Sequence, residues 1–253
     1  MKLTLTDTSN FRDAISIMSD LVTEARFTIS KSGIDSVAID PANAAMVVLK
    51  IFPTLFAECD VKDTVKVSIN LANLKQILKR TKADDILTIE MEENKLKLTL
   101  SSSSKRVFHL PLLDFDDKEQ KIPNLSFRAR VDMPSDQFVD IINDVDIVGE
   151  SVVFTTEKNR FLVSSEGDQR KAKIEIPSSD SVKIITEKEK IKNKYSIEYL
   201  KKMTSGSKVS KRVSIMMNER DDPTQKDYPV EIGFNEIDKV SLKFILAPRV
   251  DEN

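Results

Sequence analysis

Lysine and arginine side chains gather on two stretches of the chain that also carry helical spacing of apolar residues. In Leu71–Lys82 and Ile197–Met203 the apolar residues recur every three to four positions, which predicts helices with one buried face. Cations off that face attract phosphate groups without reading bases. Those on these helices or just beyond them are Lys75, Lys79, Arg80, Lys82, Lys201, Lys202, Lys208 and Lys211. The alternative is a plain solvated helix surface.

Aspartates form a stripe on another helical stretch, Ser135–Ile147. Asp136, Asp140 and Asp144 recur at every fourth residue and therefore share one face. At a rise of about 1.5 Å per residue the first and last lie about 12 Å apart, too far to converge on one metal ion. Because these aspartates would repel the phosphates of a nucleic-acid duplex, the stripe is either a solvated acidic face or a contact surface for something else.

Catalytic and metal-binding motifs are absent from the sequence. His109, the one histidine, lies in a predicted strand and has no Cys, Asp or Glu at ligand spacing around it. The sequence has five glycines and no Gly-rich phosphate loop, nucleophile elbow, HExxH or CxxC pattern. The single Cys59 cannot form an internal disulfide, which fits a reducing compartment. We therefore expect no enzyme activity, no metal and no cofactor. A hydrolase of unknown substrate is the alternative that an assay separates.

The composition indicates an intracellular globular protein. A chain of 253 residues fits two domains. Apolar residues make up 40% and charged residues 32%, and the formal net charge of −2 does not by itself indicate a nucleic-acid binder. Neither an apolar run of about 18 residues nor a signal peptide is present, so we expect a cytoplasmic protein without a membrane span. Trp is absent and Tyr numbers three, which disfavours a single-strand nucleic-acid binder that stacks bases.

Strand patterns dominate, and the order of strands and helices occurs twice. The first half predicts strands at Lys2–Thr6, Ala25–Ser30, Asp35–Asp40, Ala44–Ile51, Thr64–Ile69, Ile86–Glu92, Lys95–Ser101 and Lys105–Leu113, with helices at Phe11–Val22 and Leu71–Lys82. The second half predicts strands at Phe127–Met133, Ser151–Thr156, Arg160–Ser165, Arg170–Ile176, Val182–Thr186, Lys194–Ile197, Val209–Asn218, Tyr228–Phe234 and Val240–Leu246, with helices at Ser135–Ile147 and Ile197–Met203. Thr8, Ser9 and Asn70 are candidate N-caps.

This repeated order indicates a duplication. Residues 21–30 align faintly with 147–156, and residues 78–81 with 200–203, which means two related domains. A polar, acidic stretch lies between the halves. We therefore predict domains at 1–113 and 127–253, joined by a connecting loop at 114–126.

Several motifs then resemble the PCNA sliding-clamp family, and its archaeal branch in particular. They are Asp40-Pro-Ala-Asn43 after Lys31-Ser-Gly-Ile34, Leu78-Lys-Arg-Thr-Lys-Ala-Asp-Asp85, and Phe244-Ile-Leu-Ala-Pro-Arg-Val250 followed by Asp251 and Glu252. Leu110-Pro-Leu-Leu-Asp114 and Val131-Asp-Met-Pro-Ser135 bracket the linker where the family has its interdomain connecting loop. The resemblance covers the whole chain.

The resemblance implies an α+β fold of two similar domains of the DNA-clamp type, each with two helices packed on curved antiparallel sheet. Three subunits would close head to tail into a ring, with the helices lining a hole for double-stranded DNA. The ring would hold DNA without regard to sequence and raise polymerase processivity, in the nucleoid of an archaeal cell. Alternatives are a non-catalytic subunit of a heteromeric or checkpoint-type clamp, and a single-strand nucleic-acid-binding protein.

The resemblance also implies site residues. The DNA-binding set is the eight cations named above together with Arg12 on the first helix. Partner proteins are the replicative polymerase, the clamp loader, a flap endonuclease and DNA ligase, which would insert a short motif of one aliphatic and two aromatic residues into an apolar pocket. The matching pocket positions are Ile39, Met46, Ile122, Pro229, Ile245, Leu246, Ala247 and Pro248.

For the subunit interface, the family places the edge strand Lys105–Leu112 of one subunit against Arg170–Ile176 of the next. Such edges demand partners, although edge lysines can also simply prevent aggregation. The aspartate stripe would meet cations of the neighbouring subunit. The interface set is Arg80, Lys82, Lys105, Arg106, His109, Asp136, Asp140, Asp144, Arg170, Lys171, Lys173 and Glu175. The cationic edges leave homotrimer and heterotrimer both open.

Overall fold

The chain forms two compact units in the computed structural model, which describes residues 1–114, 120–221 and 227–249. The first unit comprises Met1–Ile122 and Asn235–Leu242, and the second comprises Pro123–Phe234 and Lys243–Asn253. Residues 115–119 of the predicted connecting loop and Val250–Glu252 of the C-terminal motif lie outside the described residues. The domain limits at 113 and 127 stay a prediction.

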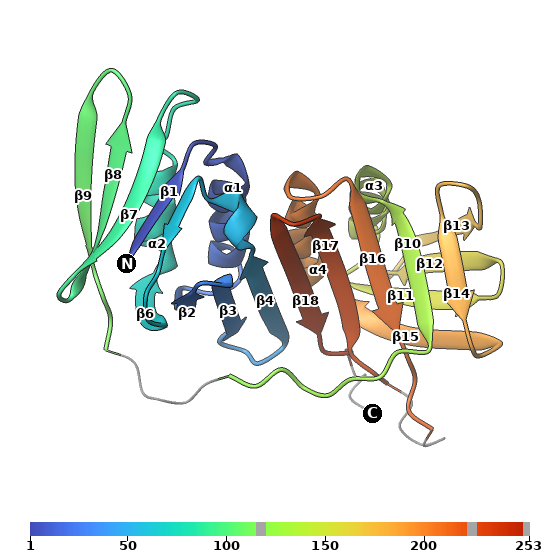
Figure 1. The fold of residues 1–253 in the computed structure, drawn as a ribbon. Helices are drawn as coiled ribbons and strands as arrows, with labels where there is room; N and C mark the ends of the chain where they lie inside the picture. Colours follow the sequence, from blue (N-terminus) through green and yellow to red (C-terminus); the bar gives the residue numbers. More distant parts are fainter. Residues whose placement is uncertain (115–119, 222–226, 250–253) are drawn as a thin grey trace. The chain divides into compact units, whose positions relative to one another are not determined.

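The first unit contains two helices and two antiparallel sheets (Figure 1). Its elements are β1 (Lys2–Leu5), α1 (Ser9–Ser19), β2 (Glu24–Ser30), β3 (Gly33–Ile39), β4 (Ala45–Ile51), the 3-10 turn η1 (Pro53–Leu55), β5 (Glu58–Asp60), β6 (Val65–Asn70), α2 (Leu71–Leu78), β7 (Ile86–Glu92), β8 (Lys95–Ser101) and β9 (Lys105–Pro111). One sheet has the order β5-β1-β7-β8-β9, and the other contains β4-β3-β2-β6.

The second unit repeats this arrangement. Its elements are β10 (Ala129–Pro134), α3 (Ser135–Asp146), β11 (Ser151–Glu157), β12 (Arg160–Glu166), β13 (Lys171–Pro177), β14 (Lys183–Thr186), β15 (Lys190–Ser196), α4 (Ile197–Thr204), the 3-10 turn η2 (Ser205–Lys208), β16 (Arg212–Met217), and the parts of β17 (Val230–Glu236) and β18 (Val240–Leu246) outside Asn235–Leu242. One sheet contains β14-β10-β16-β17-β18, and the other has the order β13-β12-β11-β15.

The two topologies correspond strand for strand, which confirms the α+β class and the duplication. The helices keep one offset, because α1 and α3 begin 126 residues apart, as do α2 and α4. The alignment of residues 78–81 with 200–203 is therefore wrong by one helical turn, and Leu74 stands at the position of Leu200. Apolar residues recur every three to four positions on a helix, so a short alignment slips easily by a turn.

Local signals explain most element ends. The side chain of Asn70 accepts the backbone N–H of Asn73 at 3.0 Å, which confirms this N-cap of α2. Thr8 is the N-cap of α1 but makes no side-chain cap bond, and Ser9 lies inside the helix. Between β3 and β4 the Asp40 carboxylate accepts the N–H groups of residues 42, 44 and 45, at 2.6 to 3.1 Å, which closes the turn that the Asp-Pro motif predicts.

Two strands depart from the sequence prediction. Strand β15 begins at Lys190 and not at Lys194. Its burial alternates, because Ile191, Asn193 and Tyr195 are buried while Lys190 and Lys192 are exposed. Strand β5 was not predicted, since three residues of sequence Glu-Cys-Asp carry no strand pattern and pair only with β1. Because charged residues occupy much of each strand, the hydrophobicity pattern does not reveal β5 or the first half of β15.

Each unit buries its helices against its sheets. In the first unit Phe11 and Ile15 of α1 and Leu74 of α2 meet β1, β2, β3, β6, β7 and β8 around an internal void of about 20 Å³. In the second unit the buried ring of Phe154 packs against Phe161 at 5.3 Å and against Tyr195 at 5.5 Å, measured between centroids. The polar faces of the helices are the faces left to solvent.

A buried carboxylate joins the loop after α2 to the edge strand β9. Asp85 is 1% exposed, and its Oδ2 accepts the backbone N–H of Lys82 at 2.6 Å and pairs with Nη2 of Arg106. Arg106 also donates to the carbonyl of Arg80 at 2.9 Å. The hydrogen bond from Arg106, and after it that from the Lys82 backbone, lower the pKa of Asp85 from 3.8 to about 2.

We expect Asp85→Asn to lower the midpoint of thermal unfolding at neutral pH, because it leaves Arg106 without its charged partner. Since the folded-state pKa of about 2 lies below the ordinary 3.8, the stabilisation is present above about pH 4 and is lost as the pH falls toward 2. The difference between wild type and variant should therefore shrink on acidification. Circular dichroism melts at several pH values measure it, and a pH-independent difference would contradict the assignment.

Candidate nucleic-acid interface and partner pocket

Five of the nine cations predicted to bind DNA have exposed charged groups without a partner. They are Lys79, Arg80, Lys82, Lys208 and Lys211. Within residues 1–114, 120–221 and 227–249, none of these charged groups makes an ion pair or a hydrogen bond. All five follow the apolar core of α2 or α4, at the helix end or in the turn after it. Lys82 and Lys208 stand 126 residues apart and are therefore equivalent in the two units.

The other four predicted cations are ion-paired inside their own unit. Arg12 lies 3.4 Å from Asp13, Lys75 2.6 Å from Asp20, Lys201 2.6 Å from Asp146 and Lys202 3.0 Å from Glu198, all measured from nitrogen to oxygen. Lys202 also lies over the ring of Tyr199 at 5.3 Å from its centroid. The sequence reading missed Asp20 and Asp146 as partners. One signal was present, because each Lys–Asp pair spans the same separation of 55 residues.

The aspartate stripe of α3 is exposed. Asp136, Asp140 and Asp144 make no ion pair with any part of the chain that the structure describes. The buried residues of α3, such as Phe138 and Ile142, lie on its other side. The stripe is thus available to a second molecule, and its proposed contact with a neighbouring subunit stays a prediction.

Both strands predicted to join subunits lie at the ends of their sheets. Strand β9 ends the order β5-β1-β7-β8-β9, and β13 ends the order β13-β12-β11-β15. Several predicted interface residues already have partners: Arg106 pairs with Asp85, His109 lies 3.5 Å from Glu92, Arg170 donates to the Ile147 carbonyl at 3.3 Å, Lys171 lies 2.5 Å from Glu166 and Glu175 lies 3.3 Å from Arg160. Lys105 and Lys173 have none among the described residues.

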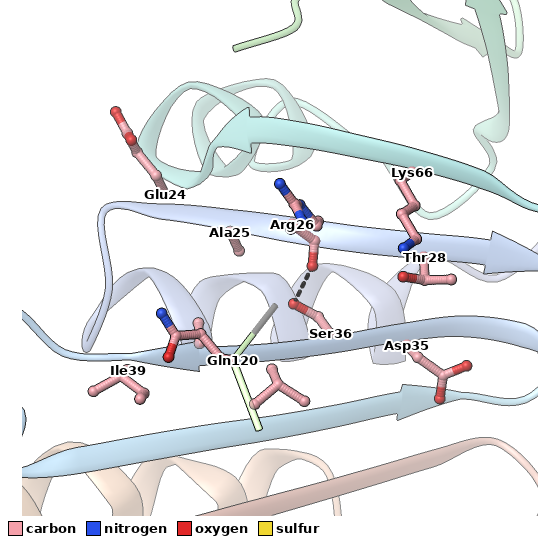
Figure 2. A pocket seen from close by; sticks show the side chains of 11 residues that line it. Glu24, Ala25, Arg26, Thr28, Asp35, Ser36, Ile39, Lys66 and Gln120 are labelled. Atoms are coloured by element: carbon pink, nitrogen blue, oxygen red, sulfur yellow. Dashed lines mark hydrogen bonds between the residues drawn. The ribbon is translucent and has the colours of Figure 1, made fainter. Parts of the chain in front are cut away.

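A groove of about 410 Å³ lies on the face of β2, β3 and β6 opposite the helices (Figure 2). Figure 2 shows Ile39, a predicted pocket residue, at one end of it, with the charged side chains of Arg26, Asp35 and Lys66 along it. Ser36 donates to the Arg26 carbonyl at 2.8 Å and ties β3 to β2 beneath the groove. Gln120, from the predicted connecting loop, also lines it. The groove is of mixed polarity, unlike a purely apolar pocket.

The other predicted pocket residues divide by burial. Met46, Ile245 and Leu246 are 8%, 7% and 1% exposed, so they are core residues as much as pocket residues. Pro229, Ala247 and Pro248 are half-buried. Ile122 is 53% exposed in a polar stretch, which makes it the best placed of the set to contact another protein.

A side-chain network holds the C-terminal end of the predicted connecting loop. The backbone N–H of Ser126 donates to the Tyr228 hydroxyl at 3.0 Å, and the side chain of Asn218 donates to the Ser126 carbonyl at 2.8 Å. The backbone of Tyr228 is fixed in turn by Asn193 and Tyr195 of β15, at 3.0 and 2.9 Å. The loop end next to Pro229 therefore has a defined position in the second unit.

Two absences apply to residues 1–114, 120–221 and 227–249. No three His, Cys, Asp or Glu side chains among them gather so that they would hold a metal ion. Within the same ranges, no helix reaches the length and apolar character that crossing a membrane requires.

Comparison with known proteins gives concordant matches over nearly the whole chain. The family model "Proliferating cell nuclear antigen, N-terminal domain" matches residues 1–120, and "Proliferating cell nuclear antigen, C-terminal domain" matches residues 121–249. The chain is 32% identical over 245 residues to a DNA polymerase sliding clamp of Thermococcus sibiricus, covering 96% of this chain and 95% of that one. It is 30% identical over 256 residues to a DNA polymerase sliding clamp of Nanoarchaeum equitans, covering 99% and 100%. A third relative, from Pyrococcus furiosus, is 31% identical over 244 residues, covering 96% and 95%.

Proposed function

Because the chain belongs to the proliferating cell nuclear antigen family, we propose that it is a DNA sliding clamp. It encircles double-stranded DNA in the cytoplasm, near the nucleoid, and tethers the replicative polymerase, which raises processivity. It is not an enzyme and needs no cofactor. The observation that carries the proposal is the repetition, at equivalent places in both units, of exposed cations without partners, foremost Lys82 and Lys208.

The DNA contact rests on Lys79, Lys82, Lys208 and Lys211. A sliding ring needs attraction to phosphates that is the same at every sequence, and exposed lysine and arginine provide it. Side chains that contact only phosphates suit this purpose, since a base-specific contact would pin the ring at one site. The formal net charge of −2 is compatible with this role because the cations are concentrated locally.

Ring closure rests on the edge strands β9 and β13, which pair between neighbouring subunits of a trimer. The stripe of Asp136, Asp140 and Asp144 faces Arg80 of the neighbour, whereas Lys82 stays free for the DNA contact. Arg106 contributes less to that contact than its charge suggests, because it is held by Asp85. Exposed ion pairs are worth about 0–1 kcal/mol each, so backbone pairing supplies most of the closure.

Partner enzymes, namely the polymerase, the clamp loader, a flap endonuclease and DNA ligase, bind through short peptides at the predicted pocket residues. The network around Tyr228 and Asn218 holds the loop end beside them. A second candidate function is that of one subunit in a heteromeric clamp. The lysines on both predicted edge strands, Lys105 and Lys173, favour it, because like charges oppose pairing of identical chains.

We expect the protein to lengthen the products of an archaeal replicative polymerase on a primed circular template, and to show no turnover of its own. Lys82→Met with Lys208→Met should weaken this effect, because two phosphate contacts per chain are lost. Primer extension on gels measures it, and light scattering of the same preparations gives the mass of the ring. If adding the wild-type protein leaves the product length unchanged, the clamp assignment is refuted. If the protein is a monomer that stimulates the polymerase only together with a related chain, the heteromeric function is established.

Charge reversal at Asp140 should reduce the trimer fraction at low salt, because the stripe would then repel the neighbour's cations. Sedimentation velocity at low and high salt measures the fraction, and the effect should fade as salt screens it. Asp63→Lys, on an exposed loop between β5 and β6, is the control of equal charge change. An unchanged distribution for the Asp140 variant would remove the stripe from the interface.

Ile122→Glu should weaken binding of a peptide with one aliphatic and two aromatic residues by tenfold or more, which is about 1.4 kcal/mol. Titration calorimetry measures the affinity, and light scattering should show an unchanged mass. The matched control is Ile237→Glu, since Ile237 is 84% exposed at the turn between β17 and β18. Leu246 is unsuitable for this test because a charge at a 1% exposed side chain would disrupt the core. Equal affinities for both variants would exclude Ile122 from the pocket.

A further inference from the structure

The helices of both units carry the same interhelical ion pair. Lys75 of α2 lies 2.6 Å from Asp20 at the end of α1, and Lys201 of α4 lies 2.6 Å from Asp146 at the end of α3. The two lysines stand 126 residues apart, and so do the two aspartates. Because the sequences of the two units have otherwise diverged, one geometry found at equivalent places indicates a shared requirement.

The aspartates stand where a helix tolerates them poorly. Asp20 is the C-cap residue of α1 and Asp146 is the last residue of α3, and neither helix has a basic residue in its last turn. The C-terminus of a helix carries partial negative charge, so a carboxylate there is unfavourable for the helix itself. Each aspartate is instead positioned to pair with the lysine on the neighbouring helix.

A second pair of equivalent lysines behaves differently. Lys82 and Lys208 also stand 126 residues apart, yet their ammonium groups have no partner among the described residues. In each unit, therefore, a lysine of the second helix is neutralised by an aspartate, whereas a lysine in the segment after that helix is not. A phosphate that approaches Lys75 or Lys201 is repelled by the carboxylate already bound to that lysine. A phosphate that approaches Lys82 or Lys208 meets no such bound carboxylate.

We infer that the pairs Lys75–Asp20 and Lys201–Asp146 limit the strength with which the clamp holds DNA. This rests on the proposed function. Each pair has no net charge, so it adds little attraction beyond its immediate surroundings. The aspartates are positioning residues that keep the lysines out of the phosphate contacts. The ring thus holds DNA through Lys82, Lys208 and their unpaired neighbours, weakly enough to slide.

The test measures binding of the full chain to a short fluorescent DNA duplex by anisotropy over a series of salt concentrations. Asp20→Asn with Asp146→Asn removes the carboxylate that neutralises each lysine, so this variant should bind more tightly. Each additional phosphate contact steepens the plot of log affinity against log salt by about 0.9, so a steeper slope by about 1.8 per chain is expected. Diffusion of the loaded ring on DNA with blocked ends should slow in parallel.

The matched control changes the same net charge on the sheets. Asp35→Asn with Glu231→Gln also frees two lysines, because Asp35 lies 2.7 Å from Lys50 and Glu231 lies 3.3 Å from Lys243. The pair of Asp35 resembles that of Asp20 in exposure as well, with side chains 48% and 42% exposed. A gain in affinity equal to that of the helix variant would show that only net charge matters and would overturn the inference.

A charge-neutral variant separates the inference from the proposed function. This variant replaces both members of both pairs and should leave DNA affinity within about twofold of wild type. Its substitutions are Lys75→Met, Asp20→Asn, Lys201→Met and Asp146→Asn, and circular dichroism checks its helix content. Weaker binding at unchanged helix content would make these lysines phosphate contacts and overturn the inference alone. Lys82→Met with Lys208→Met should bind more weakly, with a shallower salt slope. If wild type shows no salt-dependent association at all, the proposed function itself fails.

Discussion

Burial of one face of each helix pair against two antiparallel sheets is the constraint on which the charged surface depends. In the first unit Leu74 of α2 lies in the core with Phe11 and Ile15 of α1. An α-helix turns 100° per residue, so fixing Leu74 inward fixes the direction of every other side chain on α2. Lys75 is thereby brought to α1, and Lys79 is left to solvent. The electrostatic pattern follows from apolar packing.

Much of this arrangement is predictable from the chain alone. Each helix was placed within a few residues, because apolar residues repeat at helical spacing and Asn70 caps α2. The strands were found by alternation, and the duplication by their order. Strand β5 and the first half of β15 escaped, because charged residues mask short edge strands.

The partners of the charged residues were less predictable, because they depend on distance in space. The sequence predicts Arg106 as an interface cation, yet it is held by Asp85, 21 residues earlier in the sequence. Lys75 and Asp20 are separated by 55 residues, and only the folded helix pair brings them together. The burial of single residues was equally hard to predict, since Leu246 matches a pocket position but lies in the core.

The carboxylate of Asp85 couples the loop after α2 to the strand β9, because one of its oxygens accepts hydrogen bonds from both Lys82 and Arg106. Among the described residues of the second unit there is no such link at the equivalent place, since Lys211 precedes β16 where Asp85 precedes β7. A fluorophore or crosslinker attached at residues 82–85 would therefore disturb the edge strand as well as the loop. Attachment near residues 207–208 would report on the corresponding loop with the strand edge left alone.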